Sequence, residues 1–360
     1  MHLLRSMAFI LLMVVLAGCA FRPAESVLQP VQLSGHAGHL VRVLAVTNRS
    51  ASATGGYGPS RANDMSYELF TISVPQQRNG AQIRYSNDSV DPSHDYVVLE
   101  RERLTEATFL LEAQRGLPED GTAALFVHGY NQSFQEALFR LAQVTADAGV
   151  SSSAILFSWP SEASLTGYMA DRDASLASRS ELARTVELLA SQPRIRQVAL
   201  GGHSMGGFLV MEALRQLKLQ NQNRTLKKVG VILAAPDIDV ELFRSQLETI
   251  GPLSLPLIVM VSPNDRALAV SSLLGSDRPR LGMLDINDPR VQLATADFGV
   301  TLIDISSVRS QDALGHDGFA SMANFAERVA LLAGQRRDNI AETGLFIFDA
   351  ARAVLTAPLQ

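Results

Sequence analysis

Cysteine, tryptophan and clustered positive charge are scarce in this sequence, and each scarcity excludes something. The 360 residues include one cysteine, Cys19, so no disulfide can form within the chain. The formal net charge is −5, and no run of basic residues stands out. Nucleic acid is therefore not an expected partner, because phosphate binding needs concentrated positive charge. With 47% hydrophobic and 19% charged residues, the composition is that of an ordinary globular protein.

The surroundings of Cys19 predict export and lipidation. Arg5 precedes an unbroken apolar run over 8–17, which is typical of a secretory signal and too short for a spanning helix of about 20 residues. The sequence Leu16-Ala17-Gly18-Cys19 resembles the bacterial lipoprotein box, in which the cysteine is lipidated and becomes the mature N-terminus. The alternatives are a simple cleaved signal and a retained N-terminal anchor. By the same resemblance, Ala20 implies an outer-membrane location facing the periplasm.

The chain divides into four parts. We expect a signal peptide over 1–18, a tether over 19–39 with two prolines and little periodicity, a globular domain over 40–335, and a C-terminal extension over 336–360. Residues 340–357 are expected to form an apolar helix that docks on the globule, because they lack the basic face of membrane-surface helices.

Strand and helix patterns alternate through the globular domain. Residues 41–47 and 68–75 are expected to be strands, 50–60 a loop, and 76–120 has no clear assignment. Apolar strands are then predicted at 123–128, 154–159, 197–203, 229–235, 256–262 and 300–306, and helices at 133–147, 173–191, 205–219, 238–249, 265–274 and 319–332. Strands this apolar are buried on both faces. The pattern predicts a doubly wound α/β fold with a mostly parallel sheet covered by helices.

A nucleophile pattern follows the strand at 197–203. Gly202-His203-Ser204-Met205-Gly206 is G-x-S-x-G between a strand and a helix, the context in which this motif presents a serine hydroxyl above a sheet. Glycine at 202 and 206 avoids collisions with neighbouring strands, and the helix directs its positive end at the site. The sequence therefore predicts Ser204 as a nucleophile; the alternative is a glycine-rich turn of purely structural purpose.

A serine nucleophile needs a base, and the base needs an orienting acid. In the fold that carries this motif, the histidine follows the serine along the chain. His316 is the only histidine after Ser204. Asp265 ends the strand at 256–262 and is the best candidate for the acid, although it can also be read as a helix cap. The other acids considered are Asp237 and Asp239, after the preceding strand, and Asp312 and Asp317, beside the histidine.

Two backbone N–H groups are expected to form an oxyanion hole. One belongs to Met205, which follows the nucleophile, and the other to Tyr130 in the loop His128-Gly129-Tyr130-Asn131, where glycine permits a close approach. We interpret His128 as a brace for this loop rather than a second base.

Together these segments carry a resemblance. The loop 128–131, Phe157-Ser158-Trp159-Pro160-Ser161, the Ser204 turn, Ala235-Pro236-Asp237 and Ser262-Pro263-Asn264-Asp265 occur in this order. They resemble an uncharacterised bacterial α/β-hydrolase family, esterase- or lipase-like, over about 40–335. The resemblance implies Ser204, Asp265 and His316 as a triad and leaves the substrate open.

The expected function is ester hydrolysis through an acyl-enzyme. Trp159 is predicted to line an acyl pocket or, alternatively, to pack in the core. Tyr168 is predicted to bind substrate. It belongs to the segment 160–175, which either caps the site or is solvated surface. The expected partners are a small-molecule or lipid ester and, through lipidated Cys19, a membrane. No pattern indicates a metal or organic cofactor. The alternatives are an acyltransferase or thioesterase, and an inactive lipid-anchored binding or scaffold protein on the same fold.

Overall fold

The computed structural model describes residues 22–33, 38–78, 82–86, 89–148, 154–274, 277–306 and 316. The predicted signal peptide and Cys19 lie outside the described residues, as do Asp312, Asp317, the predicted helix 319–332 and the C-terminal extension.

One nine-stranded sheet forms the centre of the molecule, in the order β3-β2-β1-β5-β4-β6-β7-β8-β9. From β1 to β9 along this order every neighbouring pair is parallel, and only the β1–β2 and β2–β3 pairs are antiparallel. The strands are β1 (His39–Ala51), β2 (Tyr57–Val74), β3 (Val97–Leu104), β4 (Thr122–Val127), β5 (Ala154–Ser158), β6 (Gln197–His203), β7 (Val229–Ala234), β8 (Leu257–Val261) and β9 (Val300–Asp304). The predicted mostly parallel sheet is confirmed.

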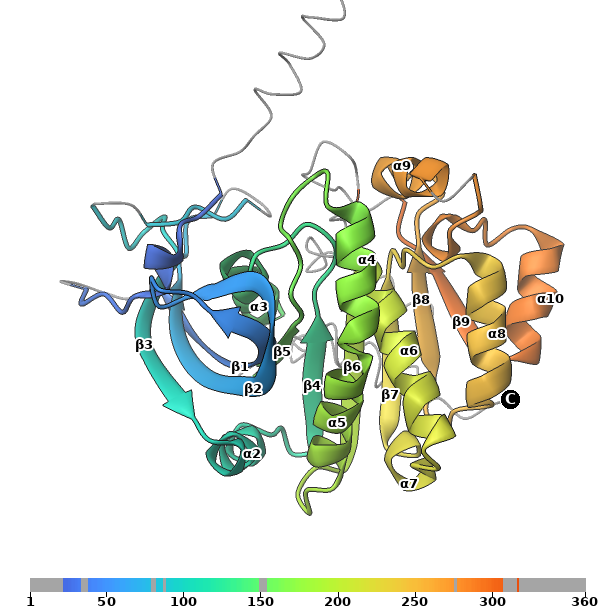
Figure 1. Ribbon diagram of the computed structural model, residues 1–360, viewed down its shortest axis with the longest axis horizontal. Helices are drawn as coiled ribbons and strands as arrows, with labels where there is room; N and C mark the ends of the chain where they lie inside the picture. The colour runs from blue at the N-terminus through green and yellow to red at the C-terminus, as the bar shows by residue number, and fades with distance from the viewer. Residues whose placement is uncertain are drawn as a thin grey trace, which may run out of the picture.

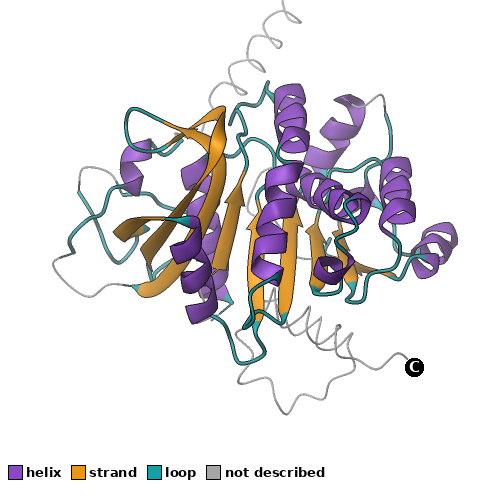
Figure 2. Cartoon of the chain, turned by 60° about the horizontal axis from the view of Figure 1, so that its bottom comes forward, coloured by secondary structure: helices purple, strands orange, loops and turns teal. Residues whose placement is uncertain are grey.

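Helices cover both faces of this sheet (Figures 1 and 2). Two hydrophobic cores result, one beneath α5, α6 and α8 and the other beneath α3. The α-helices are α2 (Glu106–Arg115), α3 (Phe134–Asp147), α4 (Tyr168–Ala177), α5 (Arg179–Ala190), α6 (Met205–Leu219), α7 (Asn223–Leu226), α8 (Val240–Ile250), α9 (Arg266–Leu274) and α10 (Pro289–Asp297), and the 3₁₀ helices are η1 (Glu25–Leu28) and η2 (Leu281–Met283). Among the described residues, none of these helices is long and apolar enough to cross a bilayer.

The apolar stripe of α3 shows how sequence pattern becomes packing. Ser133 caps the helix, and its partner Glu136 completes the capping box. Phe134, Leu138 and Leu141 then fall on one face and are all buried beneath the sheet. The predicted helix and its buried face are confirmed.

The first two strands are longer than predicted. They form a hairpin that includes most of the expected loop 50–60, with Ala51 paired to Tyr57. The polar residues of this hairpin gave no strand signal. Backbone hydrogen bonds between two exposed strands form without an alternation of apolar and polar side chains. The predicted helix 173–191 is two helices that meet at Ser178, whose Oγ donates to the carbonyl of Ala174.

The predicted tether is wrong for residues 22–33, which pack on the globule. Val27 and Leu28 of η1 are buried, and Glu25 accepts hydrogen bonds from Ser52 and Thr54 of the first hairpin. The N–H of Val31 donates to the carbonyl of Val98 at 2.9 Å. Two apolar side chains and these polar contacts hold the segment, although its prolines and lack of periodicity indicated a linker.

Candidate active site

Ser204 lies in a strained turn at the carboxyl end of β6. Its φ is 52° and its ψ −121°, a combination that a non-glycine residue adopts only when its surroundings impose it. Its N–H donates to the carbonyl of Ala234 at 3.0 Å, and its own carbonyl accepts from Gly207 and Asp237 at 3.0 and 3.1 Å. These bonds to β7, α6 and the loop after β7 hold the serine at the edge where the parallel strands end.

The glycines of the motif permit close backbone approach. A Cβ on Gly206 would lie 2.4 Å from the carbonyl oxygens of Val127 and His128, so the predicted collision with the neighbouring strand β4 is confirmed there. A Cβ on Gly202 would instead meet the backbone of Gly206 and Gly207, at 2.8 Å. Only glycine fits at these two positions, for two different reasons.

The structure brings Asp265 and His316 together. Nδ1 of His316 lies 2.6 Å from Oδ2 of Asp265, whose side chain is fully buried. The other carboxylate oxygen of Asp265 accepts from the N–H of Leu268 at 3.0 Å. The aspartate therefore caps α9 and holds the imidazole at once, so the helix-cap interpretation and the triad interpretation are compatible.

His203 links His316 to the nucleophile turn, which the sequence did not indicate. The rings of His203 and His316 lie 4.6 Å apart, and Nε2 of His203 is 3.4 Å from the carbonyl oxygen of His316. Burial, with a further contribution from His316, holds the pKa of His203 well below its ordinary value. A neutral ring thus stands beside His316 and next to Ser204 in the chain.

Asp237 and Asp239, the alternative acids, have other partners. Asp237 accepts from Tyr168 at 2.9 Å and from Ser271, and it forms a buried ion pair with Arg280 at 3.3 Å. Asp239 caps α8 through the N–H of Leu242. Of these three carboxylates, the one that contacts His316 is Asp265.

The loop after β4 packs directly against the nucleophile. A Cβ on Gly129 would lie 3.0 Å from Cβ of Ser204 and 2.9 Å from Nδ1 of His203. Tyr130 follows, with its hydroxyl donating to the carbonyls of Ser164 and Leu165 at 3.0 and 2.7 Å. Met205 is the first residue of α6, where backbone N–H groups have no acceptor within the helix. Met205 therefore follows Ser204 directly in the chain, and Gly129, the residue before Tyr130, lies against Ser204 in space.

Trp159 lies in the core, the second of its two predicted alternatives. Its side chain has no exposed surface, its indole N–H donates to the carbonyl of His128 at 2.8 Å, and its ring stacks on that of His128. Burial, followed by the charge of Arg49, lowers the pKa of His128 to about 3. His128 is thus a neutral brace at physiological pH, as expected, and the ring of Trp159 packs against it.

Tyr168 and Asp171 are both buried, which the interpretation of 160–175 as solvated surface did not anticipate. The Tyr168 hydroxyl is shared between Asp237 and Ser271, so its polar atom is engaged within the fold rather than free for substrate. Asp171 accepts from the N–H of Asn131 at 3.0 Å and from Ser161 Oγ at 2.6 Å. It therefore ties the segment after β5 to the predicted oxyanion loop.

Arg49 braces the predicted oxyanion loop, and no sequence pattern indicated it. Its guanidinium, 1% exposed, donates to the carbonyls of Gln132 and Ser161 at 2.8 and 3.0 Å and to Ser158 Oγ at 3.0 Å. Arg49 stands between Asn48 and Ser50, beyond the strand predicted at 41–47, so its polar neighbours gave no sign that it is buried. A buried guanidinium needs partners of this kind.

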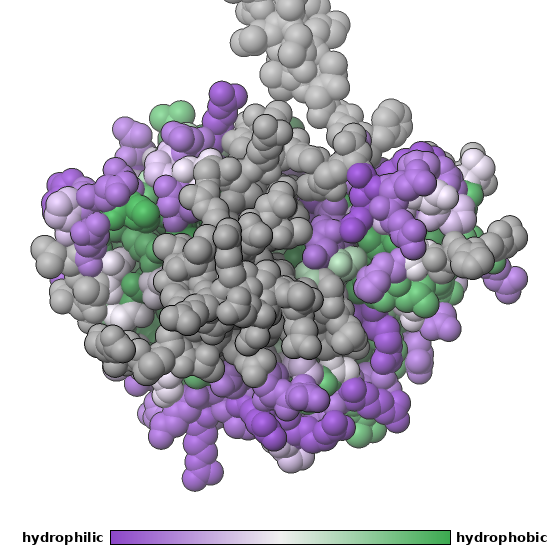
Figure 3. Space-filling model, turned by 180° about the vertical axis from the view of Figure 1, so that it is seen from behind, coloured by the Kyte–Doolittle hydropathy of each residue, from purple (hydrophilic) through white to green (hydrophobic). Residues whose placement is uncertain are grey.

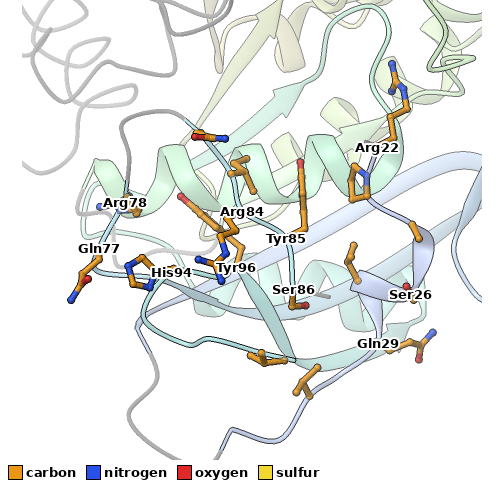
Figure 4. A pocket seen from close by; sticks show the side chains of 17 residues that line it. Arg22, Ser26, Gln29, Gln77, Arg78, Arg84, Tyr85, Ser86, His94 and Tyr96 are labelled. Carbon is orange, nitrogen blue, oxygen red and sulfur yellow. The ribbon is translucent and has the colours of Figure 1, made fainter. Parts of the chain in front are cut away.

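A hollow of about 980 Å³ lies beside the N-terminal segment (Figure 4). Its walls come from residues 22–31 and 77–96, so none of the proposed site residues lines it. Its arginines already face carboxylates: Arg22 pairs with Glu136, Arg78 with Asp147 and Arg84 with Asp95. The hollow is a packing feature of the N-terminal segment.

Comparison with known proteins places the chain in a family. Residues 111–336 match the family described as alpha/beta hydrolases of unknown function (DUF900). Similar solved structures include TT1662 from Thermus thermophilus (15% identity, 58% of this chain and 87% of that chain, TM-score 0.34), an esterase from Rhizomucor miehei (12%, 82% and 83%, 0.34) and the siderophore hydrolase EstB from Aspergillus nidulans (12%, 82% and 95%, 0.33). Among curated proteins, none matches the chain.

Proposed function

The chain belongs to a family of alpha/beta hydrolases of unknown function, and on that premise we propose that it is a serine hydrolase that cleaves carboxylic esters. The observation that carries the proposal is the pairing of His316 with buried Asp265 beside the strained turn of Ser204. A hydroxyl needs a neighbouring base to become a nucleophile at neutral pH, and an oriented imidazole is such a base.

The proposed reaction has two halves. Ser204 Oγ attacks the ester carbonyl while Nε2 of His316 takes its proton, and the N–H groups of Tyr130 and Met205 stabilise the oxyanion. His316 then gives this proton to the departing alkoxide, which is released as the alcohol. The acyl group remains bound to Ser204 Oγ. Water then attacks the acyl carbon while His316 takes its proton. The bond between that carbon and Ser204 Oγ breaks, and His316 returns the proton to Oγ, which releases the acid and the free serine.

Asp265 has an orienting role in this proposal. Because its carboxylate accepts from Nδ1 of His316, the imidazole is held in the tautomer whose Nε2 is free to accept a proton. It also stabilises the imidazolium that forms in each half-reaction. The neutral His203 adds no competing positive charge.

The direct test is a panel of p-nitrophenyl esters of increasing acyl length, with one matched thioester, assayed on wild-type protein and on Ser204→Ala. The proposal predicts ester turnover in the wild type and its loss in the variant. Turnover that survives in Ser204→Ala, or turnover of the thioester alone, would contradict it.

We also propose that Cys19 carries lipid and anchors the enzyme to the outer membrane, on its periplasmic side. The support is the apolar run 8–17 followed by Leu16-Ala17-Gly18-Cys19. A multiply acylated cysteine holds a protein on a bilayer stably, whereas a single chain does so only marginally. Wild-type protein should then sediment with membranes in high salt with a mass above that of the bare polypeptide, and Cys19→Ser should lose the added mass. A soluble periplasmic protein of unmodified mass would contradict the anchor.

A further inference from the structure

The start of the described chain is fixed to the predicted oxyanion loop. Arg22 donates to the carbonyl of Asn131 at 3.2 Å and to its side-chain oxygen, and pairs with Glu136 at 2.6 Å. The carbonyl of Pro23 accepts from Gln135 at 2.8 Å. Residue 22 is therefore held beside Tyr130, at the edge where Ser204 lies.

Chain length converts this contact into a limit on the lipid. Cys19 precedes Arg22 by three residues, and an extended chain spans at most about 3.6 Å per residue. The Cα of Cys19 thus lies within about 11 Å of that of Arg22. A lipid on Cys19 would hold this particular edge of the molecule at the bilayer, which a free tether of 20 residues would not do.

Exposed apolar side chains gather at the same edge. Of the eight large apolar side chains exposed among the described residues, five lie in the loop before α4, in α4 and in α9, at 53–70% exposure: Leu165, Met169, Val270, Leu273 and Leu274. We call these five the apolar rim. Apolar clusters on the surface of a soluble domain mark sites of contact with a partner or a membrane.

The elements that carry the apolar rim contact one another and flank the site. Met169 and Leu274 line one groove, and the hydroxyl of Tyr168 lies 2.9 Å from Ser271 Oγ, which joins α4 to α9. At one end the carbonyl of Leu165 accepts from Tyr130. At the other, α9 begins directly after Asp265. The rim therefore extends from the oxyanion loop to the proposed acid.

The ribbon shows where the elements of the apolar rim lie. Figure 1 shows α9 and the start of α4 at the upper edge, toward which β4 points. Seen from behind, the lower edge is largely hydrophilic (Figure 3). The apolar rim and the point of attachment thus lie at one edge, and that edge contains Ser204.

We propose that the apolar rim rests on the lipid bilayer, so that the site opens to the membrane and takes acyl esters embedded in it as substrates. This proposal rests on the proposed serine hydrolase function and on the lipidation of Cys19. A lipid surface fits better than a protein partner because a lipid on Cys19, three residues before Arg22, would bring a bilayer to this edge.

The orientation can be measured without any assay of activity. Lipidated Cys19 leaves the chain no free thiol, so Leu273→Cys introduces a single labelling site, and Leu219→Cys at the end of α6 is the matched control, with 61% exposure against 70%. Each full-chain protein is labelled with an environment-sensitive fluorophore and reconstituted in phosphatidylcholine vesicles that contain brominated lipid. The proposal predicts a blue shift and at least fivefold stronger quenching at 273 than at 219. Equal quenching at the two positions, or protein that leaves the vesicles, would overturn it.

The substrate class is tested with the pair Met169→Ser/Leu273→Ser, against Leu111→Ser/Leu219→Ser on α2 and α6 as control. The rim variant should hydrolyse a long-chain diacyl ester in vesicles at least tenfold more slowly than wild type, with unchanged turnover of a short water-soluble ester. The control variant should keep both rates. If both substrates are affected equally in the rim variant, the rim acts on the fold and the docking proposal fails. If the wild type turns over neither substrate, the proposed hydrolase function fails, while the quenching result still decides the orientation.

Discussion

The imidazole Nδ1 of His316 and the carboxylate Oδ2 of Asp265 lie 2.6 Å apart, although 51 residues separate them in the chain. The contact joins the loop after β8 to the segment after β9, at the carboxyl edge of the sheet. This pairing distinguishes Asp265 from the other two described candidate acids and generates the first two predictions.

Asp265→Asn should lower kcat by about 10⁴, because an amide no longer holds His316 in the required tautomer or stabilises its charged form. Esterase kinetics on the folded variant measures this. A decrease below tenfold would show that the acid of the reaction is another group.

Asp237→Asn should act on stability instead. It removes one partner of the buried ion pair with Arg280, which leaves an uncompensated charge and costs about 3 kcal/mol of unfolding free energy. Urea denaturation should detect this loss, while kcat per folded molecule should fall less than tenfold. If Asp237→Asn abolishes turnover without loss of stability, the two acids must exchange roles.

Gly129→Ala should lower kcat by about 10² through displacement of the oxyanion loop, because its Cβ would lie 3.0 Å from that of Ser204. The control is Gly201→Ala on β6, whose Cβ would make an ordinary contact of 3.5 Å with Phe126. Esterase rates of both variants are compared at equal folded fraction. Equal rates would mean that the loop does not position an oxyanion donor.

Stability should fall as the pH falls below about 6.5. The pKa of His128 is lowered to about 3 in the folded protein, so the unfolded chain takes up a proton in this range while the folded protein does not. His128 therefore costs the folded protein nothing above the unfolded pKa. Below it, the unfolding free energy decreases as the pH falls toward 3, by up to about 1.4 kcal/mol per pH unit.

The measurement is the unfolding free energy of the wild type and of His128→Asn between pH 7 and pH 5. The variant should be less stable at pH 7 but should show a smaller slope. Buried His203, whose pKa is also lowered, contributes to the slope that remains. Identical slopes would show that His128 is charged or exposed in the folded protein.

Much of this architecture could be predicted because it depends on local signals. The apolar strands around Ser204 and the helices between them follow from hydrophobic periodicity. The strand–turn–helix context of G-x-S-x-G located the Ser204 turn. Asp265 could be ranked above Asp237 by position alone, but its contact with His316 required the fold.

The remaining features depend on contacts between distant segments. Arg49 and Asp171 contact the predicted oxyanion loop, whose residues lie far from them in the chain, so neither gives a local pattern. Residues 22–33 read as a linker, yet Leu28 and Arg22 dock on the globule through surfaces made by the first hairpin and α3. The position of Trp159 after a strand allows either an acyl pocket or the core, and the structure places it in the core. Tyr168 was predicted to bind substrate from the capping segment 160–175, whereas it is buried and engaged within the fold.

The proposed reaction requires Ser204 to be an activated nucleophile. Its most direct test is incubation of the purified protein with a fluorophosphonate probe, followed by peptide mass spectrometry, for the wild type, Ser204→Ala and His316→Ala. We expect one phosphonate adduct per chain on the peptide that contains Ser204. The adduct should be absent in Ser204→Ala and should form at least 10³-fold more slowly in His316→Ala. An adduct on another residue, or a wild-type protein that remains unlabelled while folded, would contradict it.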